Sequence, residues 1–151
     1  MPLNNLYPKV GVGVMILKNG QVLLGQRKSS HGTGEYSFPG GHLEYMESLE
    51  ECAIRETKEE CGIEIANIRF QMLSNLKIYA PKHYVHIGMV ADWLSGEPQV
   101  LEPENMADWQ WYDLTNLPQP IFLASKIIID SFQSNKHYLL LEEPAYKTEK
   151  I

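Results

Sequence analysis

The sequence is poor in cysteine, with two among its 151 residues. Two cysteines cannot form the disulfide framework that stabilises a small secreted protein, so the composition favours a reducing compartment. The first residues lack the basic region and apolar run of a secretory signal. Long hydrophobic runs are also missing, and a stretch such as residues 127–129 is far too short to cross a bilayer. We therefore expect a cytoplasmic protein with no membrane partner.

Positive charge is scarce as well. The chain has 13 lysines and arginines against 19 aspartates and glutamates, which gives a formal net charge of -6. A protein that coats a nucleic acid needs a basic face that neutralises phosphates, so the composition predicts no nucleic-acid partner. A small ligand with several phosphates would need cations from another source, and divalent metal ions can supply them.

The length allows one domain, because globular domains typically take about 100–200 residues. No internal repeat, low-complexity segment or linker divides the sequence. Residues 1–151 are therefore expected to form a single domain that buries a substantial core.

Apolar patterning and turn residues predict strands interspersed with two helices, which is typical of an α/β or α+β domain with helices over a mixed sheet. The Asn19-Gly20 pair marks a hairpin turn between two apolar runs. The expected elements are a hairpin of residues 10–17 and 21–24, a loop at 29–34, an irregular Pro39-Gly40-Gly41, a helix at 48–61, strands at 68–78, 83–94 and 108–112, a turn at 116–120, and a helix at 122–132.

The helix predicted at residues 48–61 has clear signals at both ends. Ser48 followed by Glu51 matches a capping box, in which each side chain satisfies a backbone N–H of the other residue. Gly62 stands where a left-handed C-cap belongs. These signals make this helix the best defined element of the sequence.

The same helix carries an acidic face. At about 100° per residue, Glu56, Glu59 and Glu60 lie on one side, together with Leu49 and Cys52 of the apolar stripe. Burial of like charges costs several kcal/mol each unless they are paired or bound to a metal.

Two interpretations of these acids remain open. In one, they form a solvated face with helical ion pairs, such as Glu51 with Arg55 or Arg55 with Glu59. In the other, they bind a hard divalent cation such as Mg²⁺, which takes few carboxylates and keeps positions for water and phosphate. The alignment with the apolar stripe and the preceding Gly40-Gly41 turn favours the metal site.

Residues 41–63 carry a spaced motif: Gly41, five residues, Glu47, seven residues, then Arg55-Glu56-Thr57-Lys58-Glu59-Glu60-Cys61-Gly62-Ile63. It resembles the Nudix box, the signature of the Nudix hydrolase family. Thr57 stands where an aliphatic residue is usual, which affects packing and not metal binding. Residues 10–14, 23–28, 38–44 and 102–111 are similar to the nucleotide triphosphate diphosphatase branch, which contains the MutT-type enzymes.

The resemblance implies an α/β/α sandwich in which the box forms a loop, a helix and a loop against a mixed sheet. It also implies attack by water, with Mg²⁺ or Mn²⁺, on a nucleoside diphosphate linked to another group. One of the carboxylates would take the proton of the water, and the sequence leaves open which one. By matching position, Glu56, Glu59, Glu60 and the Gly41 carbonyl would hold metal, and Arg55 and Glu47 would hold the glutamates in place.

The resemblance points to hydrolysis of nucleoside or deoxynucleoside triphosphates to the monophosphate and pyrophosphate, with sanitation of the nucleotide pool as its role. A diadenosine polyphosphate or another nucleoside diphosphate derivative is the alternative substrate, since Tyr79 lies near the position of a tyrosine that marks diadenosine polyphosphate hydrolases. A nucleotide-binding regulatory module is the alternative outside catalysis. Related enzymes often form homodimers, so a dimer is a further expectation.

The residues that would choose the substrate are less sharply defined. Arg27 matches a position that approaches the phosphates, and the alternative is a surface ion pair. Aromatic stacking with a few polar contacts is a common way to hold a base, and core packing is the alternative for the aromatic candidates. A glutamate outside the box, at Glu102 or Glu104, could also contribute. The candidates for substrate binding are Arg27, Phe38, His42, His86, Trp109, Phe122 and Leu123.

Overall fold

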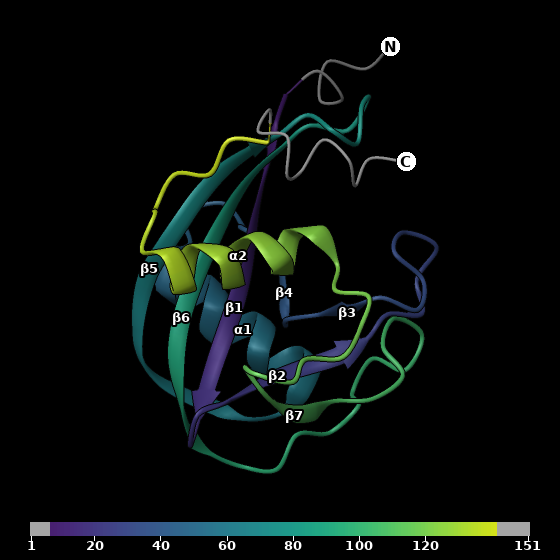
Figure 1. Ribbon diagram of the computed structural model, residues 1–151, viewed down its shortest axis with the longest axis vertical. Helices are drawn as coiled ribbons and strands as arrows, with labels where there is room; N and C mark the ends of the chain where they lie inside the picture. The colour runs from purple at the N-terminus through teal and green to yellow at the C-terminus, as the bar shows by residue number, and fades with distance from the viewer. Residues whose placement is uncertain (1–6, 142–151) are drawn as a thin grey trace.

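The computed structural model describes residues 7–141, so residues 1–6 and 142–151 of the expected domain lie outside the described range. A mixed seven-stranded sheet forms the centre of the molecule, in the order β3-β2-β1-β6-β5, with β4 paired to β1 and β7 paired to β2 (Figure 1). The elements are β1 (Lys9–Lys18), β2 (Gln21–Gln26), β3 (Tyr36–Ser37), β4 (Gly40–His42), α1 (Leu49–Cys61), β5 (Glu64–Leu76), β6 (Tyr84–Ser95), β7 (Gln110–Asp113) and α2 (Leu123–Ser134).

Strand β1 is the axis of the sheet. It pairs in parallel with β6 along most of its length and antiparallel with β2 and β4. The hairpin to β2 is confirmed: Leu17 pairs with Val22, and Asn19 and Gly20 take positive φ angles of 51° and 79°. Two successive residues with positive φ fit a tight hairpin turn, which explains the Asn-Gly pair.

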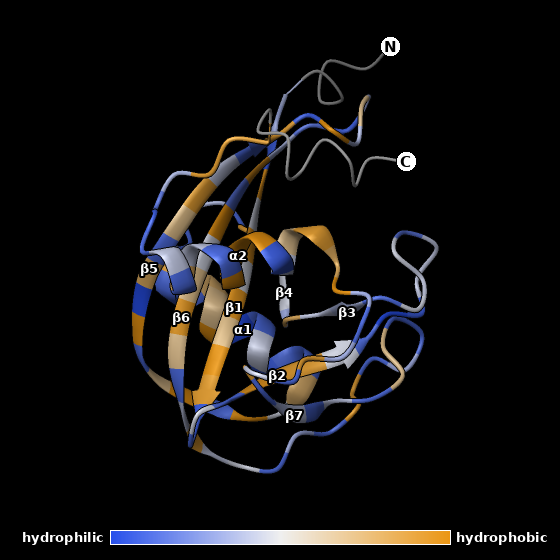
Figure 2. Ribbon diagram, in the orientation of Figure 1, coloured by the Kyte–Doolittle hydropathy of each residue, from blue (hydrophilic) through white to orange (hydrophobic). Residues whose placement is uncertain are grey.

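The helices cover opposite faces of this sheet, which confirms the α/β/α sandwich. Val14 and Ile16 of β1 pack in one cluster with Ala53 of α1. Met15, which points to the other face, packs with Ile128 of α2. Side chains alternate along a strand, so a strand covered on both faces is apolar at nearly every position. Figure 2 shows this in the hydrophobic colour of β1.

The Gly-Gly segment is a strand, which corrects the expectation of an irregular stretch. Gly40, Gly41 and His42 form β4 and pair with β1, with Gly41 opposite Val12. A side chain at Gly40 would overlap the backbone of Val12 and Gly13. Glycine usually weakens a strand, but here it permits an approach of two backbones that a Cβ atom would prevent.

Helix α1 begins and ends as predicted. The Ser48 hydroxyl accepts a hydrogen bond from the backbone N–H of Glu51 at 3.0 Å, and the Glu51 carboxylate accepts one from the N–H of Ser48 at 2.8 Å. Gly62 takes a left-handed conformation with φ 73°, and its N–H donates to the carbonyl of Lys58. The motif at residues 41–63 therefore forms a helix that is capped at both ends, and it lies between β4 and β5.

The remaining predicted elements are present with shifted ends. Strand β5 begins at Glu64, earlier than the expected residue 68. Asn67 has φ 51°, and the pairing of β5 with β6 shifts register between Ala66 and Arg69. Such irregularities break the alternation by which a strand is recognised in a sequence. No helix within residues 7–141 is long and apolar enough to span a membrane.

The packing of Thr57 predicts a stability change. Thr57 is fully buried in α1, and its hydroxyl has no hydrogen-bond partner among the described residues. An unsatisfied buried polar group costs about 1–3 kcal/mol. Thr57→Val keeps the shape and removes this group, so urea denaturation is expected to give a free energy of unfolding about 1 kcal/mol higher.

Ser74→Ala is the matched control. The Ser74 hydroxyl is equally buried but donates to the carbonyl of Leu139 at 2.7 Å. Its removal leaves that carbonyl without a partner and is expected to lower the free energy of unfolding by about 1–2 kcal/mol. A loss of stability in Thr57→Val would contradict the prediction.

Candidate active site

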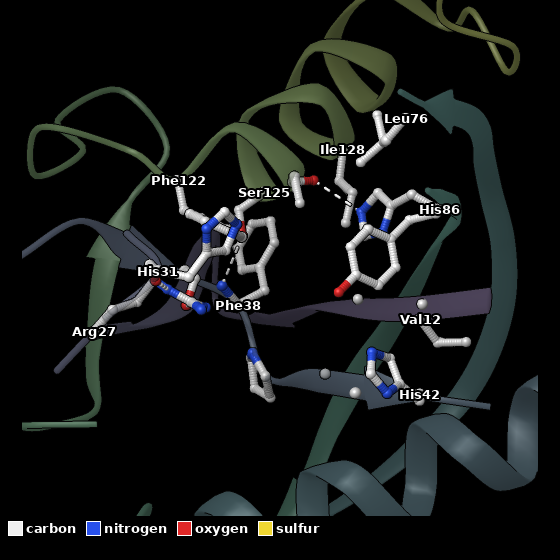
Figure 3. Close-up of a pocket in the computed structure, with 18 of the residues that line it drawn as sticks. Val12, Arg27, His31, Phe38, His42, Leu76, His86, Phe122, Ser125 and Ile128 are labelled. Carbon is white, nitrogen blue, oxygen red and sulfur yellow. Dashed lines mark hydrogen bonds between the residues drawn. The ribbon is translucent and has the colours of Figure 1, made fainter. Parts of the chain in front are cut away.

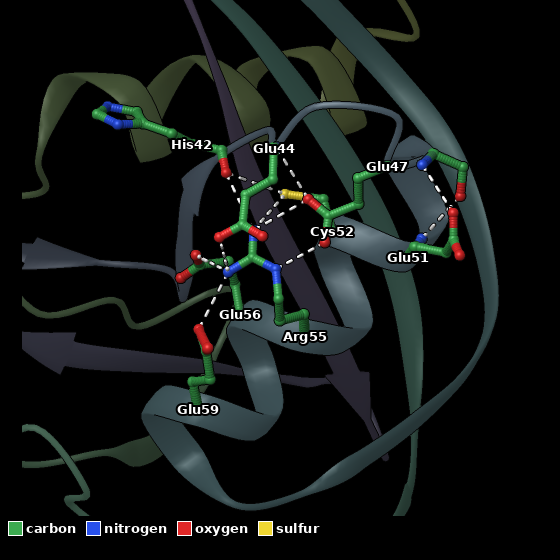
Figure 4. A network of polar contacts seen from close by, with 9 residues as sticks. His42, Glu44, Glu47, Glu51, Cys52, Arg55, Glu56 and Glu59 are labelled. Atoms are coloured by element: carbon green, nitrogen blue, oxygen red, sulfur yellow. Dashed lines mark hydrogen bonds and ion pairs between the residues drawn. The ribbon is translucent and has the colours of Figure 1, made fainter.

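The Arg55 guanidinium organises the carboxylates of the box (Figure 4). Its Nε donates to Glu47 at 2.6 Å, and its Nη1 donates to Glu56 at 2.7 Å and to Glu59 at 3.0 Å. Its Nη2 donates to the carbonyl of His42 at 3.0 Å, which ties the helix to the end of β4. Figure 4 shows these groups converging on one guanidinium from the loop, the strand and the helix.

This network stabilises the charged forms of Arg55 and Glu47. The hydrogen bond from Arg55 lowers the pKa of Glu47 to about 2, against the opposing effect of burial. The pKa of Arg55 is raised in turn, chiefly by its hydrogen bond to Glu47. Of the two helical ion pairs considered from the sequence, Arg55 with Glu59 is present. Glu51 serves the capping box instead.

Glu56 and Glu60 form the inner part of the acidic face. The Glu56 side chain is 15% exposed, whereas that of Glu59 is 49% exposed. A carboxylate oxygen of Glu60 accepts from the backbone N–H of Gly40 at 2.9 Å. Burial raises the pKa of Glu60, and the Glu56 and Glu102 carboxylates raise it further. Burial also raises the pKa of Glu56, in opposition to Arg55. These neighbouring acids favour a bound cation or proton.

A small cavity, which we call the acidic pocket, opens onto these two glutamates. Glu102, one of the two acids considered outside the box, lies in its wall, whereas Glu104 does not. Its lining residues are Arg27, Ser29, Gly40, Glu56, Glu60, Glu102, Asn105 and Met106. The pocket thus combines three carboxylates with one arginine.

The acidic pocket fits a hard divalent ion in its donor chemistry. Oxygen ligands from carboxylates are what Mg²⁺ prefers, and Glu56 and Glu60 would hold it. The absence of a side chain at Gly41 leaves room for the Glu56 carboxylate in this position, because a Cβ atom there would overlap it. Within residues 7–141, no three acidic, histidine or cysteine side chains converge in a metal-binding geometry. The ligand roles of Glu56, Glu59, Glu60 and the Gly41 carbonyl therefore stay predictions.

A second cavity of about 240 Å³, the aromatic pocket, adjoins the acidic one (Figure 3). Pockets for whole drug-sized ligands measure roughly 300–1,000 Å³, so this one suits a single planar group better than a whole dinucleotide. Five residues expected at the substrate line it, namely Arg27, Phe38, His42, His86 and Phe122. Their roles in binding stay predictions.

Trp109 and Leu123 do not line the aromatic pocket, which corrects their expected position. Trp109 is buried in the cluster on the α1 face of the sheet, with Met106 and Leu23. Leu123 packs in the cluster under α2 and lines a different cavity. Met106 of this cluster lines the pocket but Trp109 does not, and the sequence gives no sign of which of two neighbouring apolar residues reaches a cavity.

Arg27 joins the two pockets, because it lines both. Its Nε donates to the carbonyl of His31 at 3.0 Å, and its Nη1 donates to the hydroxyl of Ser37 at 3.3 Å. Its guanidinium carbon lies 4.0 Å from the centre of the Phe122 ring, a cation–π contact. These contacts hold one positive charge at the junction, where phosphates of a ligand that spans both pockets would lie.

Three aromatic residues of the pocket wall were not among the predicted substrate-binding residues. His31 contacts Tyr79 edge-on, with ring centres 4.6 Å apart, and Phe122 at 5.3 Å. Tyr84 stacks with His42 at 5.8 Å. His31 and Tyr79 lie in loops that have no periodic pattern, so only the glycine-rich composition around His31 and the position of Tyr79 after the box hinted at a site.

Known proteins are similar to this chain in sequence and fold. The NUDIX domain family matches residues 7–132. An ADP-ribose pyrophosphatase of Methanocaldococcus jannaschii is 34% identical over 131 residues, which cover 83% of this chain and 73% of that protein. The NAD-capped RNA hydrolase NudC of Vibrio atlanticus is 31% identical over 130 residues, which cover 83% of this chain and 46% of NudC. The chain thus spans about half the length of the NudC relatives that it matches.

Among solved structures, a MutT NUDIX hydrolase from Burkholderia pseudomallei superposes with a TM-score of 0.78 at 32% identity, covering 83% of this chain and 98% of that one. The fold and the acidic pocket define a domain of the Nudix type. The chain belongs to the Nudix family, as the matched domain and these relatives show. Hydrolases of this family generally use divalent metal ions.

The contact between β4 and α1 predicts the effect of Gly41→Ala. The added methyl group overlaps the Glu56 carboxylate, which Arg55 holds at 2.7 Å and which therefore cannot yield freely. We expect a folded protein whose thermal unfolding in the presence of Mg²⁺ no longer differs from that in its absence. Wild-type protein is the control and should be stabilised by Mg²⁺. Equal stabilisation of both proteins would contradict the prediction.

The burial of His86 predicts a pH-dependent stability. Burial lowers its pKa to about 4, from 6.5 in the unfolded chain. Between these values the unfolded chain binds a proton that the folded chain does not, so the free energy of unfolding decreases as the pH is lowered, by up to about 1.4 kcal/mol per pH unit. Glutamine does not titrate, so urea denaturation at several pH values should show the stability advantage of wild type over His86→Gln shrinking below about pH 6.5. A constant difference would contradict this.

Proposed function

We propose that this chain hydrolyses a nucleoside diphosphate linked to a further group, with a divalent metal ion. The observation that carries the proposal is the junction of the two pockets. An acidic pocket with Glu56 and Glu60 adjoins an aromatic pocket of the size of a base, and Arg27 lines both. A base in one pocket would bring its diphosphate to the arginine and to the metal-binding acids of the other.

The residues of the chain would divide the work as follows. Arg27 would bind a phosphate, and Arg55 would hold the carboxylates of Glu47, Glu56 and Glu59 in place. A bound Mg²⁺ or Mn²⁺ would neutralise the diphosphate and lower the pKa of a water molecule. Glu59 and Glu60 are the candidates for accepting the proton of that water.

The group linked to the diphosphate is a finer proposal. Nucleoside and deoxynucleoside triphosphates, cleaved to the monophosphate and pyrophosphate, are supported by the intact box and by the similarity to the MutT hydrolase from Burkholderia pseudomallei. Derivatives such as ADP-ribose are supported by the pyrophosphatase of Methanocaldococcus jannaschii. The NudC relative of Vibrio atlanticus is named for NAD-capped RNA, which supports a capped RNA end as a further candidate.

A panel of substrates tests the proposal. Triphosphates of ordinary and oxidised bases, ADP-ribose, NAD, diadenosine polyphosphates and a NAD-capped RNA would each be incubated with Mg²⁺ or Mn²⁺, and pyrophosphate, orthophosphate and monophosphate would be measured. We expect metal-dependent release of a nucleoside monophosphate from at least one class. Ligand binding without hydrolysis would support a regulatory module instead. The homodimer and the cytoplasmic location stay predictions beside this panel.

The variant Glu60→Gln tests the acidic pocket on the best substrate of the panel. It keeps the shape of the side chain but removes the charge that would hold metal or accept a proton, so we expect kcat to fall about 100-fold or more. Glu50→Gln is the matched control, because Glu50 is exposed at the other end of the same helix. Equal turnover by both variants would remove Glu60 from the proposed site.

A further inference from the structure

His86 lies in the floor of the aromatic pocket, in a space that a glycine of β1 leaves for it. The side chain is on β6, 8% exposed, beside Gly11 and Gly13 of β1. A Cβ atom at Gly13 would stand 2.9 Å from Ile128 of α2 and 3.3 Å from the imidazole. The glycine therefore allows the ring to fit between the sheet and α2, as Figure 3 shows for His86 and Ile128.

One hydrogen bond fixes the protonation of this ring. The Nε2 atom of His86 lies 3.0 Å from the carbonyl oxygen of Ala124. A carbonyl oxygen can only accept, so Nε2 carries the proton. Burial lowers the pKa of His86 to about 4, so the ring is neutral near pH 7 and has a single N–H group. The other nitrogen, Nδ1, is then a hydrogen-bond acceptor.

This acceptor has no partner within the described residues. The only hydrogen bond of the ring there is the one to Ala124. Nδ1 lies on the side of Gly11, where a Cβ atom would stand 3.7 Å away, and both residues line the pocket. The absent side chain leaves this nitrogen uncovered. A ligand that enters the pocket would cover this nitrogen, so one that donates a hydrogen bond to it gains affinity over one that leaves it without a partner.

We propose that Nδ1 of His86 accepts a hydrogen bond from an N–H group of the base, so that the aromatic pocket selects bases that present a nitrogen donor on the edge that enters it. The inference rests on the proposed function and deepens it. It makes His86 a specificity-determining residue. The pocket would reject an analogue in which the same edge carries C–H or N-methyl, because such a ligand would cover the acceptor without donating a hydrogen bond to it.

Two substitutions separate the two nitrogens of the ring. In His86→Gln the side-chain amide can occupy the position of Nε2 and keep a donor for Ala124, but it has no acceptor at the position of Nδ1. In His86→Asn the amide oxygen can occupy the position of Nδ1, and the bond to Ala124 is lost. The first variant removes the proposed contact, and the second keeps it at the expense of an internal bond.

The experiment measures binding of nucleoside monophosphates by calorimetry, which needs no hydrolysis. Three pairs differ in one donor: adenine against unsubstituted purine, hypoxanthine against 1-methylhypoxanthine, and uracil against 3-methyluracil. In the pair that binds best, we expect wild type to prefer the donor at least tenfold, His86→Gln to show less than a threefold preference, and His86→Asn to retain most of it. Thermal unfolding would establish that both variants are folded.

Other outcomes overturn the inference. Equal binding of both members of every pair by wild type, an undiminished preference in His86→Gln, or no measurable binding of any pair would each reject it. Hydrolysis of the corresponding diphosphate derivatives is measured separately. A base preference without hydrolysis would reject the proposed function and leave the inference standing, whereas hydrolysis without a preference would reject the inference alone.

Discussion

The Arg55 guanidinium stands among carboxylates that would otherwise repel one another, and the geometry of the site depends on it. One planar group with several N–H donors can bind Glu47, Glu56 and Glu59 together and still reach the carbonyl of His42. A lysine has one point charge and could not hold this many directions. The loop, the end of β4 and helix α1 are thereby fixed around one positive charge, and the inner acids are left facing the acidic pocket.

Glycines determine how closely the other parts of the site approach. Gly40 lets β4 lie against β1, Gly41 leaves room for the Glu56 carboxylate, and Gly13 leaves room for His86. In each case the glycine is needed for the space of a missing Cβ atom and not for an unusual φ angle. The acidic pocket and the aromatic pocket can therefore adjoin one another at β4, whose Gly40 lines both.

Much of the fold could be predicted because its signals are local. The caps at Ser48 and Gly62 act within a few residues, and Asn19-Gly20 forms its turn alone. Strand β4 could not be predicted, because its two glycines have poor strand propensity and are stabilised only by pairing with β1. Among the site residues, the acids follow from helical spacing. The side of the sheet taken by Trp109 does not, since an isolated aromatic residue carries no period.

The sequence by itself determined the acidic helix, its two caps and the spaced motif that contains it, because all of these depend on the spacing of residues along one segment. Only the tertiary structure decided which acids are inner, with Glu60 under Gly40 and Glu59 half exposed. It also decided that Arg27 lines both pockets. His86 likewise lines the aromatic pocket, with one ring nitrogen bonded to Ala124 and the other without a partner among the described residues. These properties depend on contacts between residues far apart in the chain, and such contacts exist only once the sheet has brought the strands and helices together.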